Sequence, residues 1–330
     1  MTKDIHLCGL GNALVDIEFQ LSDSEFDSLN LQRGTMTLVD SSDQNVLIKQ
    51  MEHHTPHRSS GGSAANTIIA FGQFGGKAGY KAVLGDDDMG RFYAREFTDL
   101  GIHLDAELVP DTHTGKCLVL ITPDAERTML TALGVNGTFS AEHIVESTIA
   151  RSEWLYVEGY KFTELSGRAA IMESIMLAKK YGTKIAVSFS DTFIVNFFRE
   201  GLEEALAYAD LIFCNLTEGA AYTGLEHADE VFGALAEQFP NVCLTLGKSG
   251  SRVHWNSAAF EIPSYPTTPI DTTGAGDMYA AGFLYGITHG YSPNTAGRLG
   301  SLAASKIVSQ FGARLKESPK AIRDEILLNV

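Results

Sequence analysis

The sequence has little positive charge and no long hydrophobic run. Its 330 residues include 25 Lys and Arg against 41 Asp and Glu, which gives a formal net charge of −16 at pH 7. This excess of negative charge disfavours a nucleic-acid polymer or an anionic membrane as the partner. No apolar stretch approaches the roughly 18 residues of a membrane-spanning helix, and the first residues show no cleavable signal pattern. We therefore expect a cytoplasmic protein.

Cysteine is also scarce. Only Cys8, Cys117, Cys214 and Cys243 occur, they lie far apart, and no CxxC pair is present. Each lies in or beside an apolar, strand-like run, which is typical of a buried free thiol. We therefore expect four buried thiols in a reducing compartment.

What the sequence does contain is a regular alternation of helices and strands. Hydrophobic residues make up 44% and charged residues 20%, which is ordinary for a globular protein of this length. From about residue 140 onward, helices at 140–150 and 165–181 precede strands at 154–157 and 184–189. This alternation predicts an α/β fold with a mostly parallel central sheet. Since no linker or repeat is visible, we expect a single domain over residues 1–330.

One region departs from that alternation. Strands at 116–122 and 127–133 are joined by turn residues with no helix between them, which predicts an antiparallel hairpin. Together with early strands at 16–21 and 35–40, the hairpin can form a small separate sheet. We expect this sheet to be a lid, built from roughly residues 14–40 and 104–135, that excludes water during a group transfer.

The most informative stretch is Asp271-Thr272-Thr273-Gly274-Ala275-Gly276-Asp277, followed by an apolar run. It reads as a helix start capped by Thr272 or Thr273, where small residues leave backbone N–H groups uncovered. Such a helix start attracts an anion, most often phosphate. A carboxylate at Asp277 makes sense there if it faces a hydroxyl that loses its proton as a phosphoryl group arrives. The alternative is a well-capped buried helix with small residues for close packing.

Three further polar groups are candidates for ligand contacts. Asn12 and Asp16 follow the first strand, where open α/β sheets place their ligands. Ser59 to Asn66 is a glycine-containing segment that leads into a helix. Asn215 and Glu218 follow another strand and could hold a hydrated Mg²⁺. Each also has a plain structural explanation: an Asn turn, a tight turn and a helix capping box.

Two apparent motifs do not carry a function on this evidence. Gly9 and Gly11 suggest a dinucleotide fingerprint, but the third glycine position is Leu14, which disfavours a nicotinamide oxidoreductase. His53-His54-x-x-His57 suggests a metal cluster, but it lies in a loop beside Pro56. A solvated loop is the simpler interpretation.

Taken together, these stretches resemble the ribokinase-like (pfkB) family of carbohydrate and nucleoside kinases. The two signatures read GGSAANTIIAFGQFGG from residue 61 and DTTGAGDMYAAGFLYGI from residue 271, with NLTE and TLGKSG between them. The likeness extends from about Gly9 to Arg314. It implies a three-layer α/β/α domain with a mostly parallel central sheet and a small β-sheet lid.

The resemblance implies a kinase that uses ATP and Mg²⁺. It implies Asp277 as the catalytic base, and the backbone N–H groups of Gly274, Ala275 and Gly276 as the anion hole for the transferred phosphoryl group. Asn215 and Glu218 match a motif that organises Mg²⁺ through water. The residues implied for ATP are Thr245, Gly247 and Gly250. Those implied for the substrate hydroxyls are Asn12, Asp16, Gly61, Gly62, Ser63 and Asn66, with Arg127 carried toward the site by the lid.

The resemblance also implies two features found in some members. Asp271 and the carbonyl of Thr273 match a monovalent-cation site, often for K⁺, and the lids sometimes pair across a homodimer. Within the family, GNALVDIE, GGSAAN and ERTMLTALG are most similar to the adenosine-kinase branch.

One departure from that branch concerns the segment Gly159-Tyr160-Lys161-Phe162, where nucleoside kinases stack an aromatic ring on the base. Lys161 falls at that position, and Tyr160 or Phe162 can serve only with a shift of one residue. The leading hypothesis is an ATP-dependent kinase that converts adenosine to AMP. The alternatives are a kinase for a free sugar such as ribose or fructose, and a non-catalytic nucleotide- or sugar-binding protein on the same fold.

Overall fold

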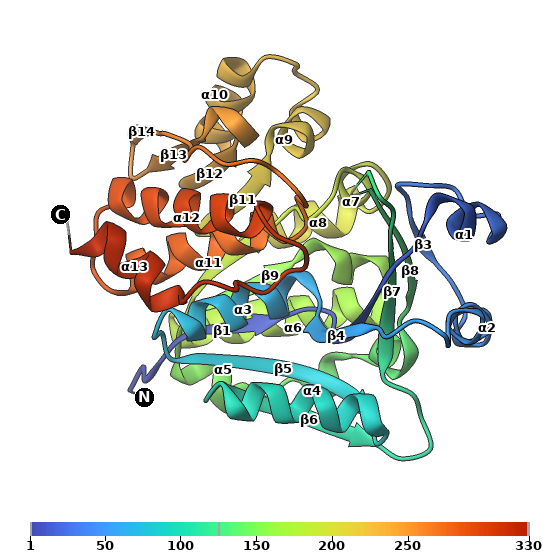
Figure 1. Ribbon diagram of the computed structural model, residues 1–330. Helices are drawn as coiled ribbons and strands as arrows, with labels where there is room; N and C mark the ends of the chain where they lie inside the picture. The colour runs from blue at the N-terminus through green and yellow to red at the C-terminus, as the bar shows by residue number, and fades with distance from the viewer. Residues whose placement is uncertain (1, 125, 329–330) are drawn as a thin grey trace.

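The computed structural model describes residues 2–124 and 126–328, and its main feature is a nine-stranded sheet between two layers of helices (Figure 1). All neighbouring strands from β12 to β6 run parallel, and β13 and β14 continue the sheet antiparallel. The expected mostly parallel sheet is confirmed. The strands in spatial order are β14 (Ala258–Ile262), β13 (Ser251–Trp255), β12 (Asn241–Thr245), β11 (Leu211–Asn215), β10 (Lys184–Ser188), β9 (Ser152–Glu158), β1 (Ile5–Leu10), β5 (Ala78–Gly85) and β6 (His103–Val109).

The central strands are apolar on both faces because each face is covered by helices. In β9, Trp154 and Tyr156 pack into one core, while Leu155 and Val157 pack into the other. The first core is covered by α3 (Ser63–Gln73), α4 (Asp88–Asp99), α11 (Ala275–Thr288), α12 (Pro293–Val308) and α13 (Pro319–Leu327). The second is covered by α5 (Glu146–Arg151), α6 (Leu165–Tyr181), α7 (Thr192–Phe197), α8 (Arg199–Leu206), α9 (Leu216–Thr223) and α10 (Ala228–Gln238).

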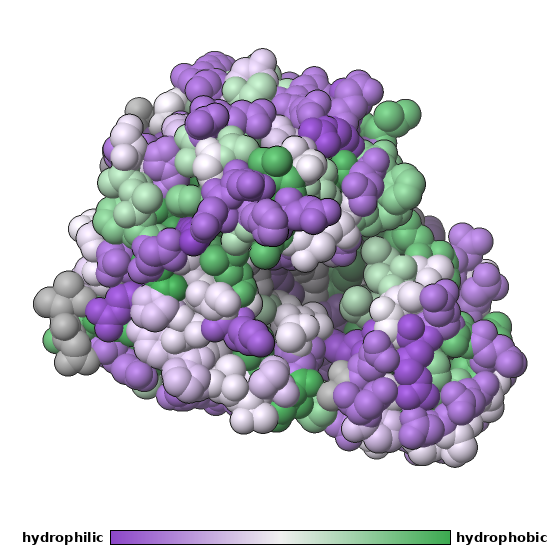
Figure 2. All heavy atoms as spheres, turned by 90° about the horizontal axis from the view of Figure 1, so that it is seen from above, coloured by the Kyte–Doolittle hydropathy of each residue, from purple (hydrophilic) through white to green (hydrophobic). Residues whose placement is uncertain are grey.

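A second, five-stranded mixed sheet forms the lid. Its order is β3 (Met36–Leu38), β8 (Arg127–Ala132), β7 (Gly115–Ile121), β2 (Leu14–Gln20) and β4 (His57–Gly61), and α1 (Asp23–Ser28) and α2 (Ser41–Gln50) flank it. The predicted hairpin is confirmed as the antiparallel pair of β7 and β8. The face seen from above is hollowed between the lid, on the right, and the bulk of the molecule (Figure 2).

The lid differs from the expected ranges in two places. Residues 103–109 form β6, the edge strand of the large sheet, where they pair in parallel with β5. The lid instead gains β4, whose sequence HRSSG shows no apolar alternation and was not predicted as a strand. It is a strand because its backbone pairs with β2, with Leu14 opposite Gly61 and Glu18 opposite His57.

Two other expectations are settled by the described residues. The helix expected at 140–150 begins only at Glu146, because short 3-10 turns occupy 134–138 and 141–143. All four cysteines are free and buried, as expected. Across residues 2–124 and 126–328, no helix combines the length and apolar character needed to cross a bilayer.

Candidate active site

Asp277 lies in the first turn of α11, the helix that packs against α3. Ser63 Oγ donates a hydrogen bond to one of its carboxylate oxygens at 2.6 Å, and Asn66 Nδ2 donates to the other at 3.0 Å. Burial raises the pKa of Asp277 to about 6, although both hydrogen bonds and the charge of Arg314 act to lower it. The residue still has part of its surface exposed. Asp277 is therefore ionised at neutral pH and basic enough to accept a proton.

Helix α11 begins without a side-chain cap. The prediction that Thr272 or Thr273 caps it is wrong, because the N-cap is Gly274 in a left-handed conformation with φ 75°. Within the described chain, the N–H groups of Gly276 and Asp277 have no acceptor, while that of Ala275 donates to the Thr272 carbonyl at 3.2 Å. Free N–H groups at a helix start carry partial positive charge, so this end of α11 suits an anion.

Arg314 completes the surroundings of Asp277 and was not among the predicted residues. Its Nη1 donates to Asn66 Oδ1 at 2.5 Å, its Nη2 donates to the Ser60 carbonyl, and its Nε lies 3.6 Å from Glu96. Arg314 therefore orients the amide whose Nδ2 contacts Asp277. Since it is a single arginine in the connection between α12 and α13, no periodicity or motif in the sequence marks it.

Asp16, on β2, is a carboxylate without a partner. Among the described residues it receives no hydrogen bond, and a Cβ on Gly61 would lie 2.3 Å from its Oδ1, so glycine is needed beside it. Burial raises the pKa of Asp16 to about 7, while the charges of Arg314 and Arg127 act to lower it. An unpaired carboxylate in this position is free to accept hydrogen bonds from ligand hydroxyls.

Asn12 is held by a buried network that the sequence did not reveal. Its Oδ1 accepts from Asn136 Nδ2 at 2.6 Å and from Lys161 Nζ at 3.1 Å. Glu158, also buried, accepts from the backbone N–H groups of Asn12 and Ala64, both at 2.6 Å. One carboxylate thereby ties the end of β1 to the start of α3. Gly62, the N-cap of α3, lies so close to Asn12 that a Cβ there would be 1.9 Å from its carbonyl oxygen.

Lys161 does not occupy a stacking position. It is fully buried, and besides Asn12 its ammonium contacts Glu164 at 2.9 Å and the Asn136 carbonyl at 3.3 Å. Phe162 is buried in the second core. Tyr160 alone of the three is only partly buried, and its hydroxyl donates to Asp191 at 3.2 Å. Of the two aromatic candidates, Tyr160 is therefore the one that can contact a ligand.

Asn215 and Glu218 lie at the carboxyl end of β11 and form a capping box at the start of α9. Asn215 Oδ1 accepts from the Glu218 N–H at 2.9 Å, and Asn215 donates to both carboxylate oxygens of Glu218, at 2.7 and 3.0 Å. Burial raises the pKa of Glu218 to about 7, with contributions from the charges of Asp191 and Asp277. Asn215 and Glu218 therefore do form the capping box that the sequence also allowed. This role is compatible with a second one, in binding a ligand near the charge of Asp277.

The three residues expected to bind ATP lie at the end of the next strand. Thr245 ends β12, and Gly247 and Gly250 flank the tight 3-10 turn that leads into β13. Nothing in the described part of the chain links them by a hydrogen bond to the Ser63, Asn66 and Asp277 group. Like Asn215, these three residues lie at the carboxyl edge of the sheet.

Arg127, on lid strand β8, connects the lid to the segment before α11. Its Nη1 contacts Asp271 Oδ2 at 2.8 Å and its Nη2 contacts Glu18 Oε1 at 3.1 Å, with all three side chains buried. The Asp271 carboxylate also accepts from the N–H groups of Thr273 at 2.9 Å and Gly312 at 3.1 Å. A guanidinium thus already balances the carboxylate that was expected to serve a monovalent cation, so this side chain does not fit that role in the structure described.

Comparisons with known proteins agree with this architecture. A family model described as pfkB family carbohydrate kinase matches residues 35–321. The crystal structure of adenosine kinase from Sinorhizobium meliloti is 30% identical, with a TM-score of 0.89 over 97% of this chain and 99% of that one. A probable sugar kinase from Rhizobium etli is 27% identical, with a TM-score of 0.90 over 98% and 99%. Adenosine kinase 1 of Arabidopsis thaliana is 24% identical over 95% of this chain and 96% of its own length.

These likenesses extend over the large sheet and the lid together. The expected ribokinase-like α/β fold is confirmed, and so is the expected family. The chain belongs to the pfkB family of carbohydrate kinases, and it is an ATP-dependent phosphotransferase for a sugar or a nucleoside.

Proposed function

We propose that the protein phosphorylates the primary hydroxymethyl group of adenosine to give AMP, with ATP and Mg²⁺. The observation that carries the nucleoside assignment is the aromatic side chain of Tyr160, a residue that is only partly buried. Its hydroxyl donates to Asp191 at 3.2 Å. A flat ring of this kind gives a nucleobase a surface on which to stack.

In this proposal Asp277 takes the proton from the attacking hydroxyl. Its pKa of about 6 leaves it ionised at neutral pH, and general base catalysis of this kind contributes about 10²- to 10⁴-fold to a rate. The N–H groups at the start of α11 bind the transferred phosphoryl group, and within the described chain those of Gly276 and Asp277 have no acceptor of their own. Gly274 and Ala275 form the rest of this anion hole.

The substrate hydroxyls are proposed to bind between the lid and α3. Asp16 has free acceptor oxygens, and Arg314 fixes the Asn66 amide beside Asp277. Gly61 and Gly62 allow the backbone to come close to the ligand. Asn12 is positioned by Lys161 and Asn136, and Ser63 donates to Asp277. Arg127 reaches the segment before α11 from the lid.

ATP is proposed to lie along the carboxyl ends of β11 and β12, against Thr245, Gly247 and Gly250. Asn215 and Glu218 would hold the water shell of Mg²⁺, since a buried carboxylate and a neutral amide suit a cation that keeps most of its waters. When bound, Mg²⁺ neutralises charge on the phosphates, which matters in a site that already contains the carboxylates of Asp277, Glu218 and Asp16.

The proposal is tested by ATP-to-ADP turnover with Mg²⁺ across adenosine, inosine, guanosine, ribose and fructose, with the phosphorylated product identified in each case. We expect turnover with adenosine. Turnover only with a free sugar would replace the nucleoside assignment by the sugar-kinase one, which the likeness to the probable sugar kinase favours. If no substrate turns over but adenosine and ATP bind, the non-catalytic alternative holds.

The variant Tyr160→Ala separates the two substrate classes. Stacking of a base on an aromatic ring contributes about 1–3 kcal/mol, so KM for adenosine should rise about 5- to 150-fold while kcat changes little. Tyr160→Phe is the matched control, since it keeps the ring and removes only the hydrogen bond to Asp191. An equal effect of the two variants on KM would mean that the ring does not contact the base.

A further inference from the structure

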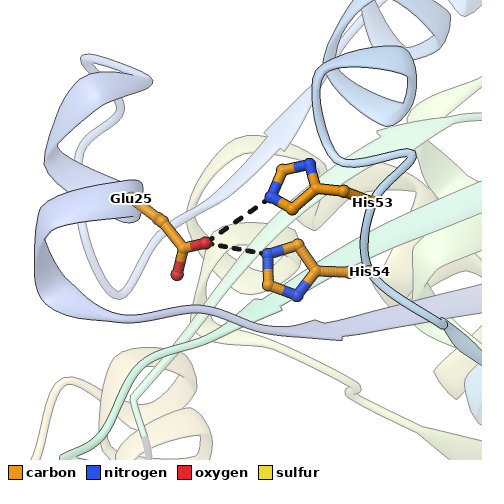
Figure 3. Close-up of side chains that lie close together, drawn as sticks. All are labelled: Glu25, His53 and His54. Carbon is orange, nitrogen blue, oxygen red and sulfur yellow. Dashed lines mark hydrogen bonds and ion pairs between the residues drawn. The ribbon is translucent and has the colours of Figure 1, made fainter.

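Three side chains of the lid converge on one point outside the candidate active site (Figure 3). Glu25 comes from α1, and His53 and His54 come from the turn that follows α2. Glu25 Oε1 lies 2.9 Å from His54 Nε2 and 3.6 Å from His53 Nε2, and the three donor atoms lie within 4.8 Å of one another. The sequence did not reveal Glu25 as a partner of these histidines, since it is remote from them in the chain.

The spacing matches that of ligands around a small metal ion. In a tetrahedral zinc site with bonds of about 2.0–2.1 Å, ligand atoms are about 3.3–3.4 Å apart. The two distances to Glu25 Oε1 fall on either side of that value. Both imidazoles present Nε2 to the same oxygen, as Figure 3 shows.

The Glu25 carboxylate is oriented by Ser22, which binds the oxygen that does not face the histidines. Its second oxygen, Oε2, accepts hydrogen bonds from the Ser22 N–H at 2.8 Å and from Ser22 Oγ at 2.6 Å, in the capping box of α1. Outer partners of this kind commonly fix the ligands of metal sites.

We propose that Glu25, His53 and His54 form a binding site for a divalent transition-metal ion such as Zn²⁺, with water as the fourth ligand. Two imidazoles and a carboxylate are a donor set that suits such ions, whereas Mg²⁺ prefers oxygen alone. The His53 side chain is 64% exposed and that of Glu25 is 40% exposed, so the ion and its water can enter. His57 is not part of the site, because its Nδ1 lies 3.3 Å from Glu18 instead.

The position of the site gives the metal a structural effect on the lid. The chain leaves β2 just before Ser22 and enters β4 just after the histidines, so the site closes one end of the β2–β4 pair. The other end of that pair carries Gly61, beside Asp16. A bound ion therefore adds a further link between these two lid segments, and it should stabilise the lid by mass action.

The test is calorimetric titration of the full-length, chelator-treated protein with Zn²⁺ in excess Mg²⁺, which occupies oxygen-only sites. We expect one zinc ion per chain. Glu25→Gln, His53→Ala and His54→Ala should each weaken binding by at least about tenfold, and His57→Ala, the matched control, should leave it unchanged. Zn²⁺ should also raise the Tm of the wild type but not of Glu25→Gln, and Co²⁺ should give the visible absorption bands of a tetrahedral site.

Three results would overturn the proposal. The first is the absence of zinc binding by the folded wild type. The second is unchanged binding by Glu25→Gln or His53→Ala, which would place the ion elsewhere. The third is a loss of binding in His57→Ala equal to that in the ligand variants. In each case the cluster is an ion pair between Glu25 and the neighbouring imidazoles. Because circular dichroism checks that each variant is folded, a loss of binding reports on the ligands themselves.

Discussion

Two aspartates six residues apart, Asp271 and Asp277, show how neighbouring carboxylates acquire different roles. Asp271 is buried against the guanidinium of Arg127 and two backbone N–H groups. Among the described residues, Asp277 receives a hydroxyl and an amide hydrogen bond and forms no direct ion pair, while Arg314 contacts the Asn66 amide beside it. The first anchors the lid to the large domain through an ion pair. The second remains free to exchange a proton.

The difference comes from what each carboxylate faces and not from the residue type. A cation in direct contact holds a carboxylate in its charged form, whereas burial without one raises the pKa. Glu158 and Asp16 extend this second class, since burial raises the pKa of each to about 7. The candidate active site is therefore a group of carboxylates that lack direct ion pairs, which is typical of functional sites.

The largest effect should come from Asp277→Asn. The amide keeps the shape of the side chain but cannot accept the proton, so kcat should fall about 10²- to 10⁴-fold. The measurement is ADP release under saturating adenosine and ATP. Binding of both ligands, followed by calorimetry, should persist because the fold and the anion hole remain. Retention of most of the wild-type kcat would remove Asp277 from the chemistry.

Arg127→Met should have the next largest effect, on stability. It leaves Asp271 and Glu18 buried without their cation, which typically costs about 3–5 kcal/mol. The free energy of unfolding from urea titration measures this. Arg168→Met is the matched control, because Arg168 also bridges two acids, Glu200 and Glu204, but does so at the surface. Exposed pairs contribute about 0–1 kcal/mol, so equal losses for the two variants would mean that burial of the Arg127 pair is unimportant.

A smaller effect is expected on the pH profile. The base must be ionised, so kcat/KM should be full above the pKa of Asp277, about 6, and fall as the pH drops through it. Ser63→Ala removes a hydrogen bond that lowers this pKa, so the acid limb should move to higher pH. Ser305→Ala, whose hydroxyl bonds only within α12, should not move it.

This shift identifies which carboxylate controls the profile. Glu158, Asp16 and Glu218 also have raised pKa values of about 7, but none of them accepts a hydrogen bond from Ser63. An acid limb that stays in place in Ser63→Ala would assign the titration to one of these other groups.

The sequence predicted the parts of the fold that depend on local patterns. The helix at 165–181 was placed with the bounds that α6 has, because its end is marked by a glycine. For α6 the stop is Gly182 in the left-handed conformation. Strand β4 was missed, because it exists only through pairing with β2 and its own residues carry no strand pattern.

The residues of the candidate site also fall into those that local patterns predict and those that depend on long-range contacts. Asp277, Ser63 and Asn66 were recognised because each belongs to a dense local motif, yet their direct contact joins residues more than 200 positions apart. Arg314 and Glu158 were missed because each is a single charged residue in an ordinary segment. Their roles arise from long-range contacts to Asn66 and Asn12, and one sequence carries no signal for these.

The smallest effect is expected from exchanging K⁺ for another monovalent cation in the assay. Because Arg127 already supplies the positive charge beside Asp271, and two N–H groups also donate to its carboxylate, a cation there would add little. Turnover in K⁺ should therefore match turnover in tetramethylammonium, which is too large to be bound by one carboxylate and a carbonyl. Strong activation by K⁺ would mean that Arg127 leaves Asp271 during the catalytic cycle. Asp271 would then lack its ion pair during part of the cycle. The two aspartates would differ in when each is paired, and not in their permanent surroundings.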